Sequence, residues 1–292
     1  QNRELFDTCD KFTFQVPLIR GRQVVEYPVN QELLTSRYTE QAVNWIQQSG
    51  EEPFFLYLAH NMPHAPVFAS ESFQGKSKGG RYGDVIEEID WSVGQVMQAI
   101  KDKGLDDRTI VVFTSDNGPW SMFGPHGGTA APLRGEKGTC WEGGYRVPGI
   151  FRWPGKIKPG IVEGLAANLD LYATFARLAS GAGPSEETTA QPGYISLDLT
   201  DALLQNAPSP REQWIYSSGA MAFRSGPYKI HLSTKDRSSN PNTRRGEPMA
   251  RHDPPLLFDL SRDISEQHNL AADHPEIVER LMEEMAAFRG AK

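Results

Sequence analysis

Hydrophobic residues recur along this chain with two different spacings, which predict its helices and its strands. A spacing of three and four residues predicts helices over 35–49, 84–103, 170–180 and 275–288. Thr35 or Ser36 is placed to cap the first helix, and Asp84 with Glu87 resembles a capping box at the start of the second. We therefore expect two long helices in the first third of the chain, one in the middle and one at the C-terminal end.

Apolar runs without helical spacing predict the strands. The longer runs cover 54–59, 110–113 and 147–153, and shorter ones cover 24–27, 214–217, 221–224, 228–232 and 256–260. The runs at 54–59 and 110–113 have the composition of strands buried on both faces, and the helix between them predicts a β-α-β unit with a right-handed crossover. The short C-terminal runs, with a turn at 225–227, predict an antiparallel sheet packed by the last helix.

This order of elements predicts two parts of unequal size. Residues 1–193 are expected to form an α/β domain with a mixed or parallel sheet between helices, and residues 194–292 a small α+β subdomain with an antiparallel sheet. The segment 181–193 is rich in Gly, Pro, Ser and Thr, which is typical of a linker.

Polar residues follow two of the predicted buried strands, and they are the first candidates for chemistry. Asp116 and Asn117 come just after 110–113, and His64 lies in a proline-flanked loop after 54–59. In open α/β sheets the ligand crevice lies outside the carboxyl ends of the strands, where oxygens such as these suit a hard cation. The alternatives are an ordinary Asp-Asn-Gly turn and a structural or solvated histidine.

A glycine-rich loop with basic residues comes next. Lys137 lies between Gly135 and Gly138, a position that favours close approach of the loop to an anion, although a solvated surface lysine is the alternative. Arg134 and the loop residue His126 are weaker candidates: Arg134 could pair with an acidic residue, and His126 could be merely exposed.

Several ordered motifs give the chain a family resemblance. They are SDNGP at 115–119, PLRGEKGT at 132–139, WEGGYRVPGIFRWPG at 141–155, FFLYLAHNMPHAP at 54–66, YGDVIEEIDWSVG at 82–94 and LFDLSRDISEQHNL at 257–270. In this order and spacing they resemble the second half of type I sulfatases, near arylsulfatase A and N-acetylgalactosamine-6-sulfatase. The resemblance covers most of the chain and implies an alkaline-phosphatase-like fold.

The resemblance also implies a reaction and a set of site residues. Asp116 and Asn117 fall on calcium ligands of the family, and His64 and Lys137 fall on residues that contact the sulfate ester and stabilise or protonate the departing alkoxide. His126 and Arg134 stay candidates for substrate contact from the sequence alone, beside the alternatives given above. The expected substrate is a sulfated small molecule or glycan, and the expected location is periplasmic, secreted or lysosomal.

Two motifs of the family are missing. An early Asp-Asp pair completes the calcium site in similar sulfatases, and a Cys/Ser-x-Pro-x-Arg motif supplies the formylglycine nucleophile. Cys9 is followed by Asp-Lys-Phe and Cys140 by Trp-Glu-Gly, so neither matches. We therefore expect this chain to lack the N-terminal part of a longer sulfatase, to need that part for activity, and to expose an apolar strand edge without it.

Composition excludes some functions and leaves others open. With 30 basic and 37 acidic residues the net charge is −7, so no basic field attracts nucleic acid. No apolar run is long enough to span a membrane, and the two cysteines could be bridged or unpaired. Two alternatives to a sulfatase remain: a phosphatase or phosphodiesterase of the same superfold, and an inactive sulfatase-like binding module.

Overall fold

The computed structural model describes residues 8–191, 195–217, 221–235 and 249–290. The chain divides into two compact units: unit 1 is Gln1–Thr109, Trp120–Thr129 and Ser238–Arg245, and unit 2 is Ile110–Pro119, Ala130–Arg237 and Gly246–Lys292. Each unit is described by itself. The predicted domain boundary at 193/194 lies outside the described residues and stays a prediction.

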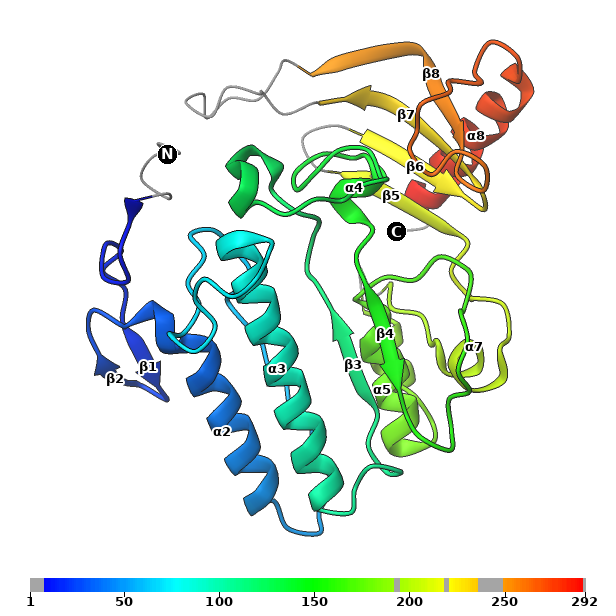
Figure 1. The fold of residues 1–292 in the computed structure, drawn as a ribbon. Coiled ribbons are helices and arrows are strands. Elements are labelled where there is room, and N and C mark those ends of the chain that lie inside the picture. Colours follow the sequence, from blue (N-terminus) through cyan, green and yellow to red (C-terminus); the bar gives the residue numbers. More distant parts are fainter. Residues whose placement is uncertain (1–7, 192–194, 218–220, 236–248, 291–292) are drawn as a thin grey trace. The chain divides into compact units, whose positions relative to one another are not determined.

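Unit 1 is built around two long helices. α2 (Leu34–Gln48) and α3 (Gly80–Asp102) lie side by side (Figure 1). They are preceded by an antiparallel hairpin of β1 (Leu18–Arg20) and β2 (Gln23–Glu26) and by the 3-10 helix η1 (Gln31–Leu33). A second 3-10 helix, η2 (Ser121–His126), completes the unit.

The predicted caps of both long helices are wrong. Thr35 and Ser36 lie inside α2, and Asn30 instead caps η1 by accepting the N–H of Glu32. α3 begins at Gly80, so Asp84 lies within the helix, where its carboxylate accepts N–H groups from Gly75, Lys76 and Ser77. These donors belong to the loop before α3, so the Asp84 carboxylate holds that loop and does not cap the helix.

Glu88 also lies in α3, on the face packed against the preceding loop. It is fully buried and accepts the N–H of Ser70 at 2.9 Å. Burial raises the pKa of Glu88. Glu88 therefore lies between α3 and the loop before it and not on a solvated face of the helix.

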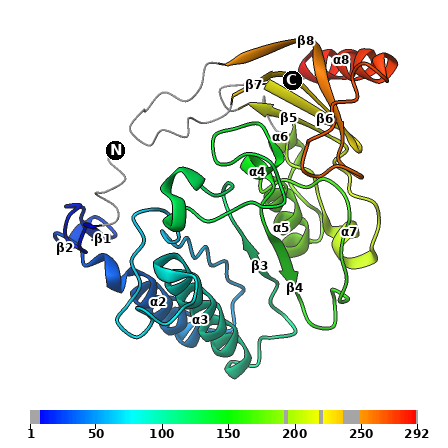
Figure 2. The same cartoon turned by 45° about the horizontal axis from the view of Figure 1, so that its top comes forward.

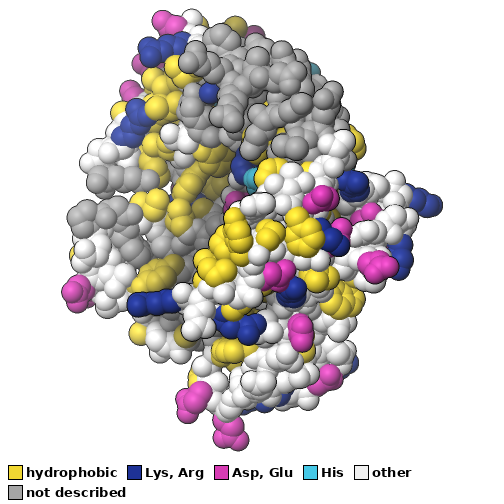
Figure 3. Space-filling view, turned by 90° about the vertical axis from the view of Figure 1, so that its left-hand side faces the viewer, with side chains coloured by type: hydrophobic (Ala, Val, Ile, Leu, Met, Phe, Trp, Pro, Cys, Tyr) yellow, Lys and Arg dark blue, Asp and Glu magenta, His cyan; other side chains and the backbone are white. Residues whose placement is uncertain are grey.

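The predicted buried strand at 54–59 is not formed. In the described part of the chain no sheet includes these residues, and Phe55 and Tyr57 are 70% and 81% exposed. A strand is defined by ladder hydrogen bonds to a neighbouring strand, and apolar composition alone does not provide that neighbour. The β-α-β unit expected from this run is consequently absent from the described structure, and the apolar side chains remain at the surface. Figure 3 shows hydrophobic side chains gathered on one face of the molecule.

Unit 2 begins with a two-stranded sheet. β3 (Val111–Thr114) pairs antiparallel with β4 (Gly149–Arg152), with Thr114 opposite Gly149. Phe113 is 39% exposed, so the expectation that this run is buried on both faces is wrong for the described structure. All strand pairings of the described residues are antiparallel. The parallel part of the expected sheet is therefore not found among them.

The helices of unit 2 lie between and after its strands. They are α4 (Glu142–Tyr145), α5 (Asp170–Ser180), α6 (Glu186–Thr189), α7 (Thr200–Gln205) and α8 (Pro275–Gly290). α5 begins and ends as predicted, because Gly181 adopts the left-handed conformation that closes the helix.

A four-stranded antiparallel sheet forms the C-terminal part of unit 2, as predicted. Its strands are β5 (Gln213–Ser217), β6 (Met221–Ser225), β7 (Tyr228–Thr234) and β8 (Ala250–Asp259), in that spatial order (Figures 1 and 2). Gly226, with φ of 56°, makes the predicted turn between β6 and β7. α8 packs Leu281 and Met285 against Phe223 and Ile230 of the sheet, which forms one hydrophobic core.

Strand β7 carries two fully buried polar side chains, Lys229 and His231. His231 Nε2 lies 2.7 Å from Glu266 Oε1. Burial, with the Lys229 ammonium acting in the same direction, lowers the pKa of His231 to about 4, against the effect of the bond to Glu266. The imidazole is therefore neutral near pH 7, and its Nε2–H donates to the carboxylate.

This buried histidine predicts acid sensitivity of folding. The pKa of His231 is about 4 in the folded chain and about 6.5 in an unfolded one, so the unfolded state binds the proton more readily. Its contribution is complete above about pH 6.5 and falls by up to about 3 kcal/mol as the pH drops toward 4. Urea unfolding of the His231→Asn variant should show a shallower loss of stability over that range.

A matched control is His268→Asn, since the His268 side chain is 79% exposed. It should keep the pH dependence of the original chain. Equal pH slopes for the original chain and His231→Asn would contradict the assignment of a neutral buried imidazole.

The composition also raised two questions, about the pairing of the cysteines and about membrane-spanning segments. Cys9 and Cys140 are both buried thiols and not disulfide partners. In the described ranges, no helix has the length and apolar character to cross a membrane.

Candidate functional site

The Asp116–Asn117 pair lies on a turn that begins directly after β3. Ser115 Oγ donates to the carbonyl of Asn117 at 3.1 Å, and Asn117 Nδ2 donates to the carbonyl of Gly118 at 3.3 Å. Because the amide nitrogen of Asn117 is used in this way, its Oδ1 is the atom that could serve as a ligand. Asp116 is exposed and Asn117 half-buried.

Asn168 holds the strand end from the other side. Its Oδ1 accepts from Thr114 Oγ1 at 3.0 Å, and its Nδ2 donates to the carbonyl of Ser115 at 2.8 Å. The sequence analysis missed this residue, because nothing in the local pattern of an asparagine far along the chain indicates a contact with β3. It joins the candidate site as the residue that orients the backbone leading into Asp116.

Two backbone hydrogen bonds tie this turn to the loop that carries Lys137. The N–H of Lys137 donates to the carbonyl of Pro119 at 2.8 Å, and the N–H of Gly118 donates to the carbonyl of Gly144 at 3.1 Å. Lys137 thus lies on a segment directly beside the Asp116–Asn117 turn, and these three predicted residues are brought together within unit 2.

Close backbone packing explains the glycines of these motifs. A Cβ atom on Gly118 would lie 1.8 Å from the carbonyl oxygen of Gly143, and one on Gly144 would lie 2.5 Å from that of Thr139. Gly135 has φ of 80° and Gly138 has φ of 82°, the left-handed region that favours glycine. The loop can therefore approach the turn only with glycine at these positions.

The donors present fit a calcium ion in kind but not in number. Asp116 and Asn117 supply side-chain oxygens, which calcium prefers, whereas calcium takes roughly six to eight oxygen ligands. Among the described residues no group of three or more His, Cys, Asp or Glu side chains could hold a metal ion. A calcium site at this turn would need further oxygen ligands besides these two side chains.

The two candidate histidines belong to unit 1. His64 is exposed and its Nδ1 lies 2.8 Å from the carbonyl oxygen of Ala65. Since a carbonyl oxygen only accepts, Nδ1 carries a proton, and Nε2 is the atom left to exchange a proton with a ligand. The ring of His64 contacts that of Trp120 edge to face, with centroids 5.9 Å apart. His126 is half-buried at the end of η2.

Arg134 has contacts that compete with its predicted role. Its guanidinium stacks over the Trp141 ring at 3.7 Å from the centroid and donates to the carbonyl of Glu266 at 3.1 Å. These contacts are structural, and substrate binding by Arg134, like that by His126, stays a prediction. Glu142, an acidic residue close to Arg134 in the sequence, bonds Lys229 Nζ at 2.9 Å.

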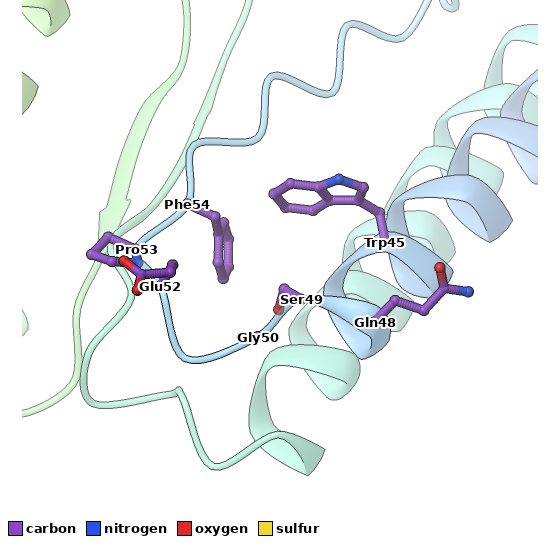
Figure 4. A pocket seen from close by; sticks show the side chains of 7 residues that line it. All are labelled: Trp45, Gln48, Ser49, Gly50, Glu52, Pro53 and Phe54. Atoms are coloured by element: carbon purple, nitrogen blue, oxygen red, sulfur yellow. The ribbon is translucent and has the colours of Figure 1, made fainter.

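The pocket in Figure 4 does not contain any predicted site residue. It lies at the end of α2, where Trp45 and Phe54 meet edge to face with centroids 5.2 Å apart, and Glu52 is among its lining residues. It lacks a basic group, so it is not suited to a sulfate ester.

Comparisons with known proteins agree on one family. Residues 1–182 match the family model described as Sulfatase, and residues 209–291 match that of the C-terminal region of aryl-sulfatase. Human arylsulfatase A is 38% identical over 291 residues, which are 94% of this chain and 56% of that protein. N-acetylgalactosamine-6-sulfatase of Canis lupus familiaris is 36% identical over 276 residues, 86% of this chain and 52% of that protein.

A solved structure gives the same answer for the fold. PsFucS1 sulfatase from Pseudoalteromonas sp. superposes with a TM-score of 0.80 at 27% identity, covering 92% of this chain and 56% of that one. The chain spans about half the length of the relatives that it matches. The resemblance inferred from the motifs is thereby confirmed, and the chain belongs to the type I sulfatase family.

Proposed function

We propose that this chain is the part of a sulfate ester hydrolase that carries the Lys137 loop, two calcium ligands and the C-terminal subdomain. The observation that supports this most is the pair of backbone hydrogen bonds, Lys137 to Pro119 and Gly118 to Gly144. They join the segment that carries Lys137 to the turn that carries the two oxygen donors, which supports a shared site. The substrate class is an aryl or sugar sulfate.

The proposed roles follow from the chemistry of each side chain. The Lys137 ammonium binds the sulfate oxygens and offsets their charge. Asp116 and Asn117 would contribute side-chain oxygens to a calcium ion, and calcium would supply positive charge to polarise a sulfate group. The nucleophile is expected to be a formylglycine. This residue and the remaining calcium ligands would come from the part of the family's length that this chain does not span.

His64 is proposed as the proton donor. Sulfur–oxygen cleavage leaves an alkoxide or phenoxide, and the imidazolium form of His64, which has a proton on each ring nitrogen, would neutralise it by giving up the Nε2 proton while Nδ1–H stays bonded to Ala65. The hydrogen bond between Nδ1 and Ala65 supports this role, since it fixes which ring nitrogen is available.

The test uses the protein encoded by the complete reading frame that contains these residues. Hydrolysis of 4-nitrophenyl sulfate should require calcium and fall when EGTA is added. Lys137→Ala should lower kcat/KM by about 100-fold or more, since an electrostatic contact to the reacting group is removed. Lys158→Ala, at an exposed lysine of the same unit, serves as the control and should change little.

Other outcomes would replace the proposal. Preferential hydrolysis of 4-nitrophenyl phosphate by a zinc-loaded protein would indicate a phosphatase or phosphodiesterase of the same superfold. Binding of a sulfated glycan without turnover of either ester would indicate a binding module.

A further inference from the structure

Within unit 2, a cluster of buried charges contacts the loop that carries Lys137. Its members are Glu142 of α4, Lys229 and His231 of β7, and Glu266 of the segment after β8. Each side chain is at most 2% exposed. Lys229 Nζ lies 2.9 Å from Glu142 Oε1 and 3.0 Å from Glu266 Oε1, so one ammonium bridges two carboxylates.

Glu266 connects this cluster to both ends of the loop. Its second carboxylate oxygen accepts the N–H of Glu142 at 2.6 Å, and its main-chain carbonyl accepts from Arg134 at 3.1 Å. The neighbouring Ser265 Oγ donates to the carbonyl of Pro132 at 2.7 Å. The segment around Glu266 therefore holds the loop before and after Lys137.

The backbone at Glu266 is itself unusual. Its φ is 51°, in the left-handed region that a residue other than glycine or asparagine rarely adopts. Such a conformation persists where the surroundings determine it, and residues of this kind concentrate at functional sites. Here the carboxylate and the carbonyl of Glu266 and the neighbouring serine all contact the loop or the buried cluster. The left-handed backbone of Glu266 therefore allows one short segment to hold the loop.

Burial of this many charges does not by itself favour stability. A well-packed apolar cluster of similar volume is often as stable as a buried ion pair or more so. What buried charges add is a defined geometry, because each carboxylate oxygen must accept a hydrogen bond from a donor in a particular position. The arrangement is therefore better explained by a need for one loop geometry than by a need for stability.

We propose that Glu266 and Lys229 are positioning residues that set the geometry of Lys137 for sulfate binding, so that the C-terminal sheet is part of the catalytic apparatus. This inference rests on the proposed function of Lys137. Neither residue contacts the substrate. They act through Glu142 and Arg134, the anchors of the loop.

The first experiment needs no enzymatic activity. Amide hydrogen exchange is measured on the 292-residue chain and on Glu266→Gln, which keeps the size of the side chain and removes its charge. Exchange should become about tenfold faster or more at Lys137, Thr139 and Gly143, with α8 unchanged. The control is Arg280→Met, at an exposed ion pair on α8. Unchanged exchange at these loop amides would overturn the proposal.

The second experiment uses the complete enzyme and separates positioning from general structure. Glu266→Gln and Lys229→Met should raise KM for the sulfate ester about tenfold, with a smaller change in kcat. In a Lys137→Ala background, Glu266→Gln should have no further effect on KM, because the residue through which it acts is gone. A full additional increase in KM in that background would overturn the proposal.

The two experiments also distinguish this inference from the proposed function. If Lys137→Ala alone leaves kcat/KM unchanged, the proposed function fails, and the positioning of Lys137 for sulfate fails with it. If Lys137→Ala is defective but Glu266→Gln changes neither loop exchange nor KM, only the positioning inference is overturned.

Discussion

Replacing Gly118 by alanine should separate the Asp116 turn from the Lys137 loop. The added Cβ would lie 1.8 Å from the carbonyl oxygen of Gly143 and 3.2 Å from the Cα of Gly144. These are backbone atoms of a packed loop, so they cannot move aside as a flexible side chain would. We expect a loss of about 3 kcal/mol in unfolding free energy, at the upper end for overpacking.

The same substitution should remove the candidate site. The hydrogen bonds from Gly118 to Gly144 and from Lys137 to Pro119 are adjacent, and they cannot both survive a shift of this size. Urea unfolding and amide exchange at Lys137 measure the two effects. Gly149→Ala is the matched control, since Gly149 lies in the facing strand β4 with nothing within 4 Å of an added Cβ. Equal stabilities for the two variants would contradict the packing argument.

Replacing Arg211 by methionine should destabilise unit 2 by about 3–5 kcal/mol, since it leaves a buried carboxylate without its cation. Arg211 Nε donates to Asp170 Oδ2 at 2.7 Å, and a second guanidinium nitrogen bonds Asp170 Oδ1 and the carbonyl of Ile195. Asp170 is 0% exposed, and its only other described donors are the N–H groups of Ala167 and Leu197.

The consequence should extend to the site. Asp170 begins α5 two residues after Asn168, the residue that holds the end of β3. Loosening of this segment should therefore raise amide exchange around Ser115. Urea unfolding measures the loss of stability, and Asp170→Asn in the Arg211→Met background should recover part of it by removing the unpaired charge.

An exposed ion pair provides the comparison. The side chains of Arg280 and Glu284 are 48% and 27% exposed, and Arg280→Met should cost less than about 1 kcal/mol. A similar small cost for Arg211→Met would contradict the argument that the buried Asp170 carboxylate depends on this cation.

The helices and the C-terminal sheet were the features that local patterns predicted best. Spacing of apolar residues identified α8, and the left-handed Gly181 closed α5 as expected. Helix starts were predicted less well, because a cap depends on contacts beyond the helix. Asp84 resembles a capping residue in sequence, but its carboxylate serves the loop before α3.

The residues of the candidate site also fall into two groups, those that local motifs predicted and those that only the structure revealed. Asp116, Asn117 and Lys137 were identified from motifs, and the structure places them on hydrogen-bonded neighbouring segments. Asn168 and Glu266 were not predicted, because each contacts residues far away in the sequence: Asn168 bonds Ser115, and Glu266 bonds Glu142. No local spacing relates such a residue to its partner.

The sequence by itself determined the family and most of the helices and supplied the candidate residues of the site, because motifs and periodicity are properties of neighbouring residues. Only the tertiary structure decided which strands are paired and which charges are buried. The run at 54–59 has the composition of a buried strand, yet Tyr57 is 81% exposed, whereas Lys229 has the composition of a surface residue and is fully buried. Burial and strand pairing depend on groups supplied by distant parts of the chain, so composition alone cannot predict them.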